Sequence, residues 1–352
     1  MVVTAKRRAP WWTRLTVALG VLLLLPAAAV AGDPVPRSGL RGPLNILLAG
    51  IDPRGTHVRP LSDTIIVAHI PADRHAAYLF SLPRDLVVWI PPFPRTGSAG
   101  QYAKINAAMA LGSETSPGKY DPAVGLELLA DTVEGVTGIK RFDGGAVINF
   151  GGFKQMVASM GGVRMVIDQD VSSEHLRPDG TPRDVSAACR ASKNCLRPYT
   201  GAQKIYRKSL HPVRLRPWEA LDYLRQRYGL PRSDYDRQRH QRQFLKAVAD
   251  QVGRDPARLT EVLSAAGDSL VIDAGGHALT DWLLELKDLD VRTVTTISLP
   301  GEPVFWNGKY LGEQFTPDVA GFFAAVGRDR VAAYLLDHPT LVDAATSRSR
   351  RP

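Results

Sequence analysis

The chain has 352 residues, of which 44% are hydrophobic and 22% are charged, and it contains 2 cysteines. This composition excludes a disordered chain, a collagen and a small fold held together by disulfides, and the length allows a large buried core. The formal net charge is +9, and residues 204–246 contain twelve lysines and arginines against four acidic residues. That stretch favours an anionic ligand, such as nucleic acid, lipid head groups or a phosphorylated molecule.

The first 32 residues predict export from the cytoplasm. A basic segment, residues 1–14, precedes an uncharged run, residues 15–32, that is just long enough to cross a hydrocarbon core of roughly 30 Å. Cations before such a run keep the N-terminus in the cytoplasm, so we expect a retained transmembrane signal anchor. A cleaved signal peptide is the alternative, because Ala29-Val30-Ala31 fits a cleavage site. Both interpretations place the chain from residue 33 onward outside the membrane.

The exported part divides into a linker, a fold and a tail. Residues 33–43 are rich in Pro and Gly and predict a linker, residues 44–340 predict one extracytoplasmic domain, and residues 341–352 predict a disordered basic tail. Residues 168–203 form a long polar connection, and such connections are usually functional or mobile. Cys189 and Cys195 lie in it, and in an exported chain they favour a local disulfide over a metal pair or free thiols.

Hydrophobic patterning predicts an α/β fold. The expected strands are Leu44–Gly50, Thr64–Ile70, Ala76–Leu82, Leu86–Ile90, Ala146–Asn149, Val163–Ile167 and Val294–Leu299. The expected helices are Ala123–Val136, Phe150–Met160, Pro217–Arg227, Tyr235–Val252, Ala257–Ala266, Leu279–Leu289, Pro317–Val326 and Asp329–His338. Because the strands are largely apolar on both faces, we expect a central mixed β-sheet covered by helices on both sides, an α-β-α sandwich preceded by one transmembrane helix.

The first three strands bring charged residues to one edge of the sheet. If these strands form an antiparallel meander, Asp52 after the first, Asp63 at the start of the second and Arg84 after the third meet at the same rim. Two carboxylates with an arginine suit a hydrated Mg²⁺ that bridges phosphate oxygens. Turn capping and surface ion pairing remain the structural alternatives for these residues and for Asp85.

Further cations complete a candidate anion site. Lys104 is expected at the start of a short helix, where free backbone amides assist phosphate binding. Arg225 and Arg227 can face one ligand only if their helix ends there, whereas Arg237 and Gln241 share a helix face because they are four residues apart. Several converging arginines suit a pyrophosphate. A solvated basic helix is the alternative, and Arg239 and Arg242 are expected to lie away from the site.

The ordered set of motifs resembles the LytR-CpsA-Psr family over about residues 44–340. The matching segments are Asn45–Asp52, Ser62-Asp63-Thr64, Ser81–Asp85, Lys104–Ala107, Phe150–Val163, Ala220–Arg227 and Asp234 through Arg237 to Gln241. The resemblance implies an Mg²⁺-assisted envelope phosphotransferase. Such an enzyme moves a glycopolymer from a polyprenyl pyrophosphate carrier onto peptidoglycan through a phosphodiester.

The resemblance also implies roles for individual residues. Asp52 and Asp63 would bind Mg²⁺, and the pyrophosphate would be held by Arg84, Lys104, Arg225, Arg227, Arg237 and Gln241. Asp63, Arg84 and Asp85 are the expected catalytic residues, with Asp63 or Asp85 removing the proton of the acceptor. The polyprenyl chain requires an apolar groove, for which Phe142, Phe150, Phe153 and Met156 are candidates, although core packing is the commoner role for such residues.

Two other functions fit parts of the same pattern. A membrane-bound transcriptional attenuator would use the basic segment 217–246 to contact DNA, but export places that segment across the membrane from the chromosome, so we expect no nucleic-acid partner. A polyprenyl pyrophosphate hydrolase would use the same metal and arginine set without transfer. The expected partners are therefore a lipid-linked glycan, peptidoglycan and the cytoplasmic membrane, with teichoic acid, capsule and arabinogalactan all open as the glycopolymer.

Overall fold

The computed structural model describes residues 40–52, 59–190, 195, 198–252, 256–287 and 289–343. The strands are β1 (Leu44–Ile51), β2 (Ser62–Ile70), β3 (Ala77–Ser81), β4 (Val87–Ile90), β5 (Gln101–Lys104), β6 (Glu114–Ser116), β7 (Lys119–Tyr120), β8 (Gly144–Asn149), β9 (Val163–Met165), β10 (Val171–Ser172), β11 (Asp184–Val185), β12 (Tyr199–Thr200), β13 (Ile205–Tyr206), β14 (Val213–Leu215), β15 (Leu270–Asp273), β16 (Val294–Ile297), β17 (Gly301–Trp306) and β18 (Lys309–Phe315). The helices are α1 (Ala107–Ser113), α2 (Pro122–Thr137), α3 (Phe150–Ser159), α4 (Ala187–Arg190), α5 (Pro217–Arg225), α6 (Asp234–Val252), α7 (Pro256–Ala266), α8 (Leu279–Glu285), α9 (Val319–Gly327) and α10 (Val331–Asp337).

A six-stranded mixed sheet in the order β15-β8-β1-β2-β3-β16 forms the centre of the molecule. The predicted meander is confirmed, because β1 pairs antiparallel with β2 and β2 pairs antiparallel with β3. Two parallel pairs, β1 with β8 and β3 with β16, extend this meander on its two sides. Of the predicted strands, β4 and β9 stand outside the sheet in ladders with β5 and β14, and edge strand β15 was not predicted.

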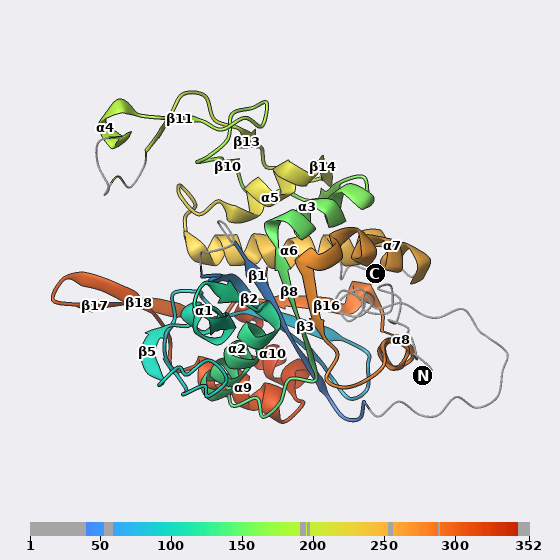
Figure 1. Cartoon of the computed structure of the whole chain (residues 1–352). Coiled ribbons are helices and arrows are strands. Elements are labelled where there is room, and N and C mark those ends of the chain that lie inside the picture. Colours follow the sequence, from blue (N-terminus) through green and yellow to red (C-terminus); the bar gives the residue numbers. More distant parts are fainter. Residues whose placement is uncertain are drawn as a thin grey trace, which may run out of the picture.

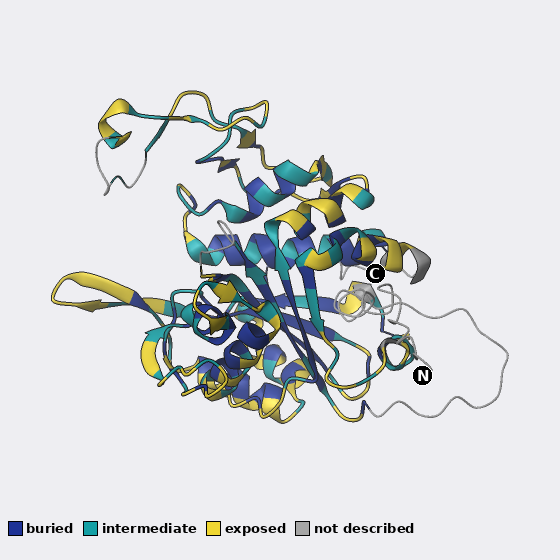
Figure 2. Ribbon diagram, viewed as in Figure 1, coloured by how far each residue is buried: buried dark blue, intermediate teal, exposed yellow. Residues whose placement is uncertain are grey.

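Helices cover both faces of the sheet, as predicted. Alternate residues of β1 point to opposite faces, so Leu44 and Ile46 join one buried cluster while Leu47 and Ala49 join the other. Helices α3, α5, α6 and α7 pack on the first face, and α1, α2, α9 and α10 pack on the second (Figure 1). The strands between these layers are almost entirely buried (Figure 2).

Local sequence signals explain where the helices begin and end. Asp121 accepts a hydrogen bond from the Ala123 backbone N–H at the start of α2, and Gly138 ends that helix in the left-handed conformation. Asn149 caps α3 in the same way. The two-glycine turn that follows, Gly161-Gly162, has positive φ at both residues.

The fold extends further at both ends than predicted. Leu40 is buried in the core and the Gly42 carbonyl accepts a hydrogen bond from Arg74, so residues 40–43 belong to the domain rather than to a linker. At the other end Val342 pairs with Ile297, and Asp343 is buried, so the predicted tail is ordered as far as Asp343. Residues 1–39 and 344–352, with the predicted anchor, lie outside the described residues. None of the helices in the described ranges is long and apolar enough to span a membrane.

Candidate functional site

A cavity of about 540 Å³ lies between the first face of the sheet and helices α3, α5 and α6. Most of its wall is apolar, with Leu48, Ile66, Phe150, Phe153, Met156 and Phe244 among the lining residues. Charged and polar side chains also line it, namely Asp63, Arg84, Arg225, Arg227, Arg237 and Gln241. Phe150, Phe153 and Met156 are therefore placed as expected, whereas Phe142 packs against the core on the opposite face of the sheet. The cavity suits an amphipathic anion.

The rim formed by the meander brings the predicted residues together. Asp52 follows the end of β1, and Asp63 lies at the start of β2, where the register between the two strands shifts, so both aspartates lie at the same rim. Arg84, which follows β3, donates from Nη1 to Asp63 Oδ1 at 2.5 Å. Burial tends to lower the pKa of Arg84, but the nearby carboxylates of Asp63, Asp234 and Asp85 outweigh it and raise that pKa. The arginine is thus held charged at the cavity wall.

Arg237 and Gln241 reach the cavity from one face of α6. Arg237 Nη2 donates to the backbone carbonyl of Asp63 at 3.0 Å and pairs with Asp234 at 2.8 Å. Asp63 therefore holds one arginine with its carboxylate and a second with its backbone. Within the described residues, the Nε atoms of Arg84 and Arg237 are buried and have no hydrogen-bond partner. Each of these N–H groups lacks an acceptor among the described residues, which is uncommon for a buried polar group.

The end of α5 supplies the other two arginines. Helix α5 stops at Arg225 because Gln226 has extended backbone angles, so Arg225 and Arg227 both line the cavity as predicted. The Arg225 guanidinium lies 4.5 Å from the Phe150 ring centre and 3.6 Å from Asp52. Arg227 donates to the Tyr228 hydroxyl at 3.1 Å. We refer to Arg84, Arg225, Arg227 and Arg237 below as the arginine clamp.

Lys104 and Asp85 lie beside the cavity rather than in its wall. Lys104 is the last residue of β5, two residues before the cap of α1, so the predicted position at a helix start is wrong. Its Nζ donates to Asp85 Oδ1 at 2.8 Å. Burial tends to raise the pKa of Asp85, but the hydrogen bond from Lys104 and the charge of Arg84 outweigh it, and the pKa is lowered. Asp85 is thus an ionised carboxylate next to the clamp.

The family model of the LytR_cpsA_psr family matches residues 30–321. This chain belongs to that family. LcpA of Corynebacterium glutamicum, a cell wall biosynthesis protein, is 26% identical over 73% of this chain and 46% of its own length. A polyisoprenyl-teichoic acid–peptidoglycan teichoic acid transferase, TagU of Enterococcus faecalis, is 29% identical over 66% of this chain and 61% of its own length. The match therefore spans about half to three fifths of these relatives.

Solved structures share the fold of this family member. Protein gbs0355 of Streptococcus agalactiae superimposes with a TM-score of 0.62 at 22% identity and covers 82% of this chain and 88% of its own. Bacillus subtilis TagV superimposes with a TM-score of 0.55 at 22% identity and covers 83% of this chain and 98% of its own. A structure of TagT bound to LIIa-WTA superimposes with a TM-score of 0.55 at 20% identity and covers 86% of this chain and 99% of its own.

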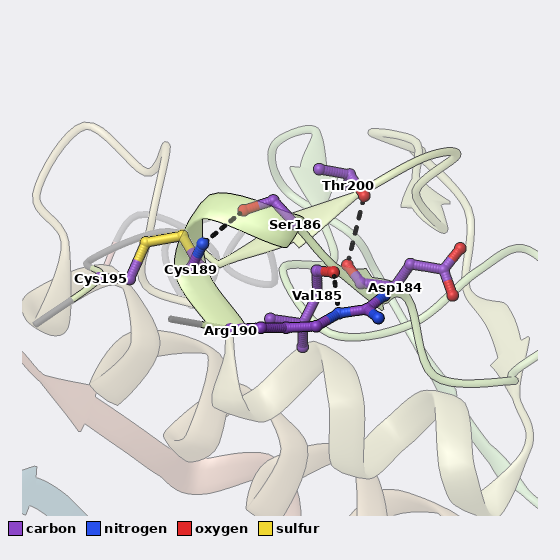
Figure 3. The surroundings of a disulfide bond; sticks show 7 residues. All are labelled: Asp184, Val185, Ser186, Cys189, Arg190, Cys195 and Thr200. Carbon is purple, nitrogen blue, oxygen red and sulfur yellow. Dashed lines mark hydrogen bonds between the residues drawn. A yellow bond between two sulfur atoms is a disulfide. The ribbon is translucent and has the colours of Figure 1, made fainter. Parts of the chain in front are cut away.

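The described residues of 171–206 form an arm that closes one side of the cavity in this family member. The long polar connection predicted for residues 168–203 contains parts of the short ladders β10–β13 and β11–β12, and the arm projects beyond α5 (Figure 1). The predicted disulfide between Cys189 and Cys195 is present at the end of α4 (Figure 3). Cys195 also lines the cavity, together with His175 and Tyr199. Sequence reasoning missed these wall residues, and the length of the connection was the only signal for them.

Buried polar contacts fasten the arm to α5. Ser173 Oγ and the Tyr206 hydroxyl both donate to the Asp222 carboxylate, at 2.9 and 2.8 Å. The Glu174 backbone N–H donates to Gln226 Oε1 at 2.8 Å. Gln226 stands between two clamp arginines, so the base of the arm and the clamp are held by the same residue.

We expect Glu219 to make the stability of this junction dependent on pH. Burial tends to raise the pKa of Glu219, but hydrogen bonds from Arg216 and Lys204 lower it to about 2. A carboxyl group whose pKa is lower in the folded state stabilises that state above its unfolded pKa, and this contribution disappears as the pH falls towards the folded pKa. Because Arg216 is half exposed, we expect Glu219→Gln to reduce the free energy of unfolding at pH 6 by only about 2 kcal/mol.

Urea unfolding of the two proteins checks this expectation. The difference in unfolding free energy between wild type and Glu219→Gln should shrink as the pH falls from about 4.5 to about 2. A difference that stays constant through that range would contradict it.

Two further cations of residues 204–246, Arg239 and Arg242, are held in ion pairs. Arg239 pairs with Asp168 at 2.9 Å and with Asp236 at 2.7 Å, and the fully buried Arg242 pairs with Asp343 at 2.9 Å. The expectation that Arg239 and Arg242 lie away from the clamp is confirmed, but both are structural residues rather than solvated ones. Two acidic residues from outside the basic stretch, Asp168 and Asp343, thus neutralise part of its charge.

Proposed function

We propose that this chain transfers a glycopolymer from a polyprenyl pyrophosphate carrier onto peptidoglycan, forming a phosphodiester. The observation that carries this proposal is a single cavity that joins a long apolar wall to the four arginines of the clamp. Arginine binds phosphate oxygens through paired N–H groups, and aromatic and aliphatic side chains accommodate a hydrocarbon chain. Relatives named as teichoic acid–peptidoglycan transferases support the same reaction class.

Asp52 and Asp63 fit a Mg²⁺ ion that arrives with its substrate. In the part of the chain that the structure describes, no group of three or more His, Cys, Asp or Glu side chains is arranged to hold a metal. Mg²⁺ commonly uses one or two carboxylates and takes its other ligands from phosphate and water, so the two aspartates at this rim are sufficient. When bound there, the ion would neutralise charge on the pyrophosphate.

The chain's own residues then position the pyrophosphate and stabilise its departure. The clamp binds the oxygens of both phosphate groups, and the charge that develops on the leaving lipid phosphate is balanced by guanidinium groups that are already in place. Lys104 places a further positive charge next to the clamp, where its hydrogen bond to Asp85 holds it. Asp63 or Asp85 accepts the proton from the acceptor hydroxyl. Asp63 lines the cavity, whereas Asp85 lies beside the cavity and accepts a hydrogen bond from Lys104 at the end of β5.

We further propose that residues 15–32 anchor the chain in the cytoplasmic membrane, with residues 1–14 in the cytoplasm and the catalytic domain outside. The basic segment precedes the uncharged apolar segment, and this order supports the arrangement. It places the cavity in the compartment that holds peptidoglycan. Three arginines of residues 204–246 line the cavity, and Arg239 and Arg242 are held in ion pairs, so we place the function in the cavity rather than in DNA binding.

Reconstitution tests the proposed reaction against hydrolysis. The full-length chain in detergent is incubated with Mg²⁺, a radiolabelled glycan on polyprenyl pyrophosphate, and peptidoglycan sacculi. Transfer predicts label that stays with the sacculi and is released by phosphodiester cleavage. Free phosphorylated glycan as the sole product would establish a hydrolase instead.

We expect the clamp to require arginine geometry as well as positive charge. Arg237→Lys or Arg225→Lys keeps the charge but loses the paired N–H groups, so polyprenyl pyrophosphate should bind about tenfold or more weakly. Arg232→Lys is the matched control, because Arg232 is half exposed and lies outside the cavity wall. It should bind like the wild type at the same salt concentration. Equal tolerance at Arg237 and Arg232 would show that these cations form only a basic surface.

A further inference from the structure

Four exposed aromatic side chains lie next to the candidate site. On the β4–β5 ladder, Trp89 is paired with Tyr102, their rings are 5.2 Å apart, and they are 49% and 76% exposed. Side chains alternate between the two faces of a ladder, and the neighbouring residues Val88 and Ile90 are buried. Trp89 and Tyr102 therefore point away from the core.

The β17–β18 hairpin extends this aromatic surface. Tyr310 is paired with Phe305, their rings are 5.8 Å apart, and both are exposed. The hairpin projects from the body of the protein beside β5 (Figure 1). We call Trp89, Tyr102, Tyr310 and Phe305 the aromatic strip.

Lys104 and the backbone of β18 link the ladder to the hairpin. Lys104 Nζ lies 5.0 Å from the centre of the Tyr310 ring. Lys104 is two residues from Tyr102 on β5, so the two side chains share the outward face of the ladder. At Gly312 an added Cβ would lie 2.3 Å from the Asp85 carbonyl oxygen and 2.6 Å from Val87, so only glycine lets β18 approach this closely.

The strip ends at the charged rim of the cavity. Lys104 joins Tyr310 to Asp85, and Asp85 lies 3.7 Å from Arg84 of the clamp. The Glu313 backbone N–H also donates to the Asp85 carbonyl at 2.8 Å. A polymer lying along the strip would therefore reach the point where an acceptor hydroxyl has to meet the pyrophosphate.

We propose that the aromatic strip binds the acceptor, a neutral glycan strand of peptidoglycan, and guides it to Asp85. This inference rests on the proposed function. Pyranose rings present flat C–H faces that stack on aromatic rings, and the Trp89 N–H and tyrosine hydroxyl groups can hydrogen-bond to sugar hydroxyls. An elongated row of rings across two elements matches a polymer better than a compact ligand.

The charges along the strip favour a glycan over an anionic lipid surface. Attraction to lipid head groups requires free cations, but Lys104, the cation within the strip, is paired with Asp85. Trp306 and Lys309 form the next pair of the hairpin and therefore point to the face opposite Phe305 and Tyr310. Trp306 thus provides an exposed aromatic side chain of the same hairpin outside the strip.

Sedimentation with purified sacculi tests the proposal. Full-length wild type and variants, in detergent, are mixed with peptidoglycan stripped of its wall polymers, and the bound fraction is measured. We expect Trp89→Ala and Tyr102→Ala each to weaken binding about fivefold, and the double variant to weaken it more. Trp306→Ala, which removes a side chain that is 69% exposed, should bind like the wild type. Unchanged melting temperatures establish that the variants are folded.

Three results would overturn the proposal. The first is that the wild type does not bind sacculi. The second is that the wild type and the strip variants bind sacculi equally. The third is that the strip variants lose binding to phospholipid vesicles but keep binding to sacculi. Failure of the proposed function is seen separately, through binding of polyprenyl pyrophosphate. Arg237→Lys should lose that binding and keep sacculus binding, whereas Trp89→Ala should show the reverse.

Discussion

Replacing Asp63 by alanine is expected to reduce glycopolymer transfer about a hundredfold or more. The change removes a proposed Mg²⁺ ligand and also the carboxylate that holds Arg84 at 2.5 Å. The backbone carbonyl that holds Arg237 remains, so the fold and part of the clamp should survive. Initial rates of transfer to sacculi measure the loss, and calorimetric titration with Mg²⁺ measures the metal affinity.

Asp73→Ala is a suitable control for this experiment. Asp73 lies in the turn between β2 and β3, at the end of the β2–β3 pair opposite Asp63, and its exposed carboxylate accepts a hydrogen bond from the His75 backbone N–H. Its removal should leave both transfer and Mg²⁺ binding unchanged. If Asp52→Ala and Asp63→Ala bind Mg²⁺ as tightly as the wild type, the assignment of the two aspartates to the metal is wrong.

Asp343→Ala is expected to lower the free energy of unfolding by about 3–5 kcal/mol. Its carboxylate accepts hydrogen bonds from Arg242 Nε and Nη2 at 3.0 and 2.9 Å, and both side chains are almost completely buried. Removing the aspartate leaves a guanidinium group in the core with only Ser81 as its remaining hydrogen-bond partner among the described residues. Urea unfolding of the full-length protein measures the change.

A double variant separates an unpaired charge from lost packing. Arg242→Met combined with Asp343→Leu replaces both ions by apolar side chains, so it should be more stable than Asp343→Ala alone. If the double variant is the less stable of the two, the cost comes from shape and volume rather than from the isolated charge.

Local sequence patterns predicted the parts of the site that depend on neighbouring residues. The apolar runs of the first three strands predicted a meander, and the meander brings Asp63 and Arg84 together across 21 positions. The helix break before Gly229 predicted that Arg225 and Arg227 face one cavity. Both predictions needed only the geometry of one strand pair or one helix end.

The features that were missed depend on contacts between distant segments. Arg242 and Asp343 are 101 positions apart, and the pattern around residue 341 resembles a polar tail unless its buried partner is known. The arm residues His175 and Tyr199 reach the cavity only because α5 holds the base of the arm. The β17–β18 hairpin has exposed residues on both faces, so it lacks the period-two alternation by which strands are recognised.

Gln226 limits which sequence changes the protein can tolerate. Its side chain accepts the Glu174 N–H and donates to the carbonyl and carboxylate of Asp222, while its backbone ends α5 between Arg225 and Arg227. Changes near the outer end of the arm would leave these contacts intact. Substitutions at Gln226 would displace the base of the arm together with two arginines of the proposed phosphate clamp. Under the proposed function, the outer arm therefore tolerates changes that suit different polymers, whereas a change at Gln226 affects the proposed carrier site as well.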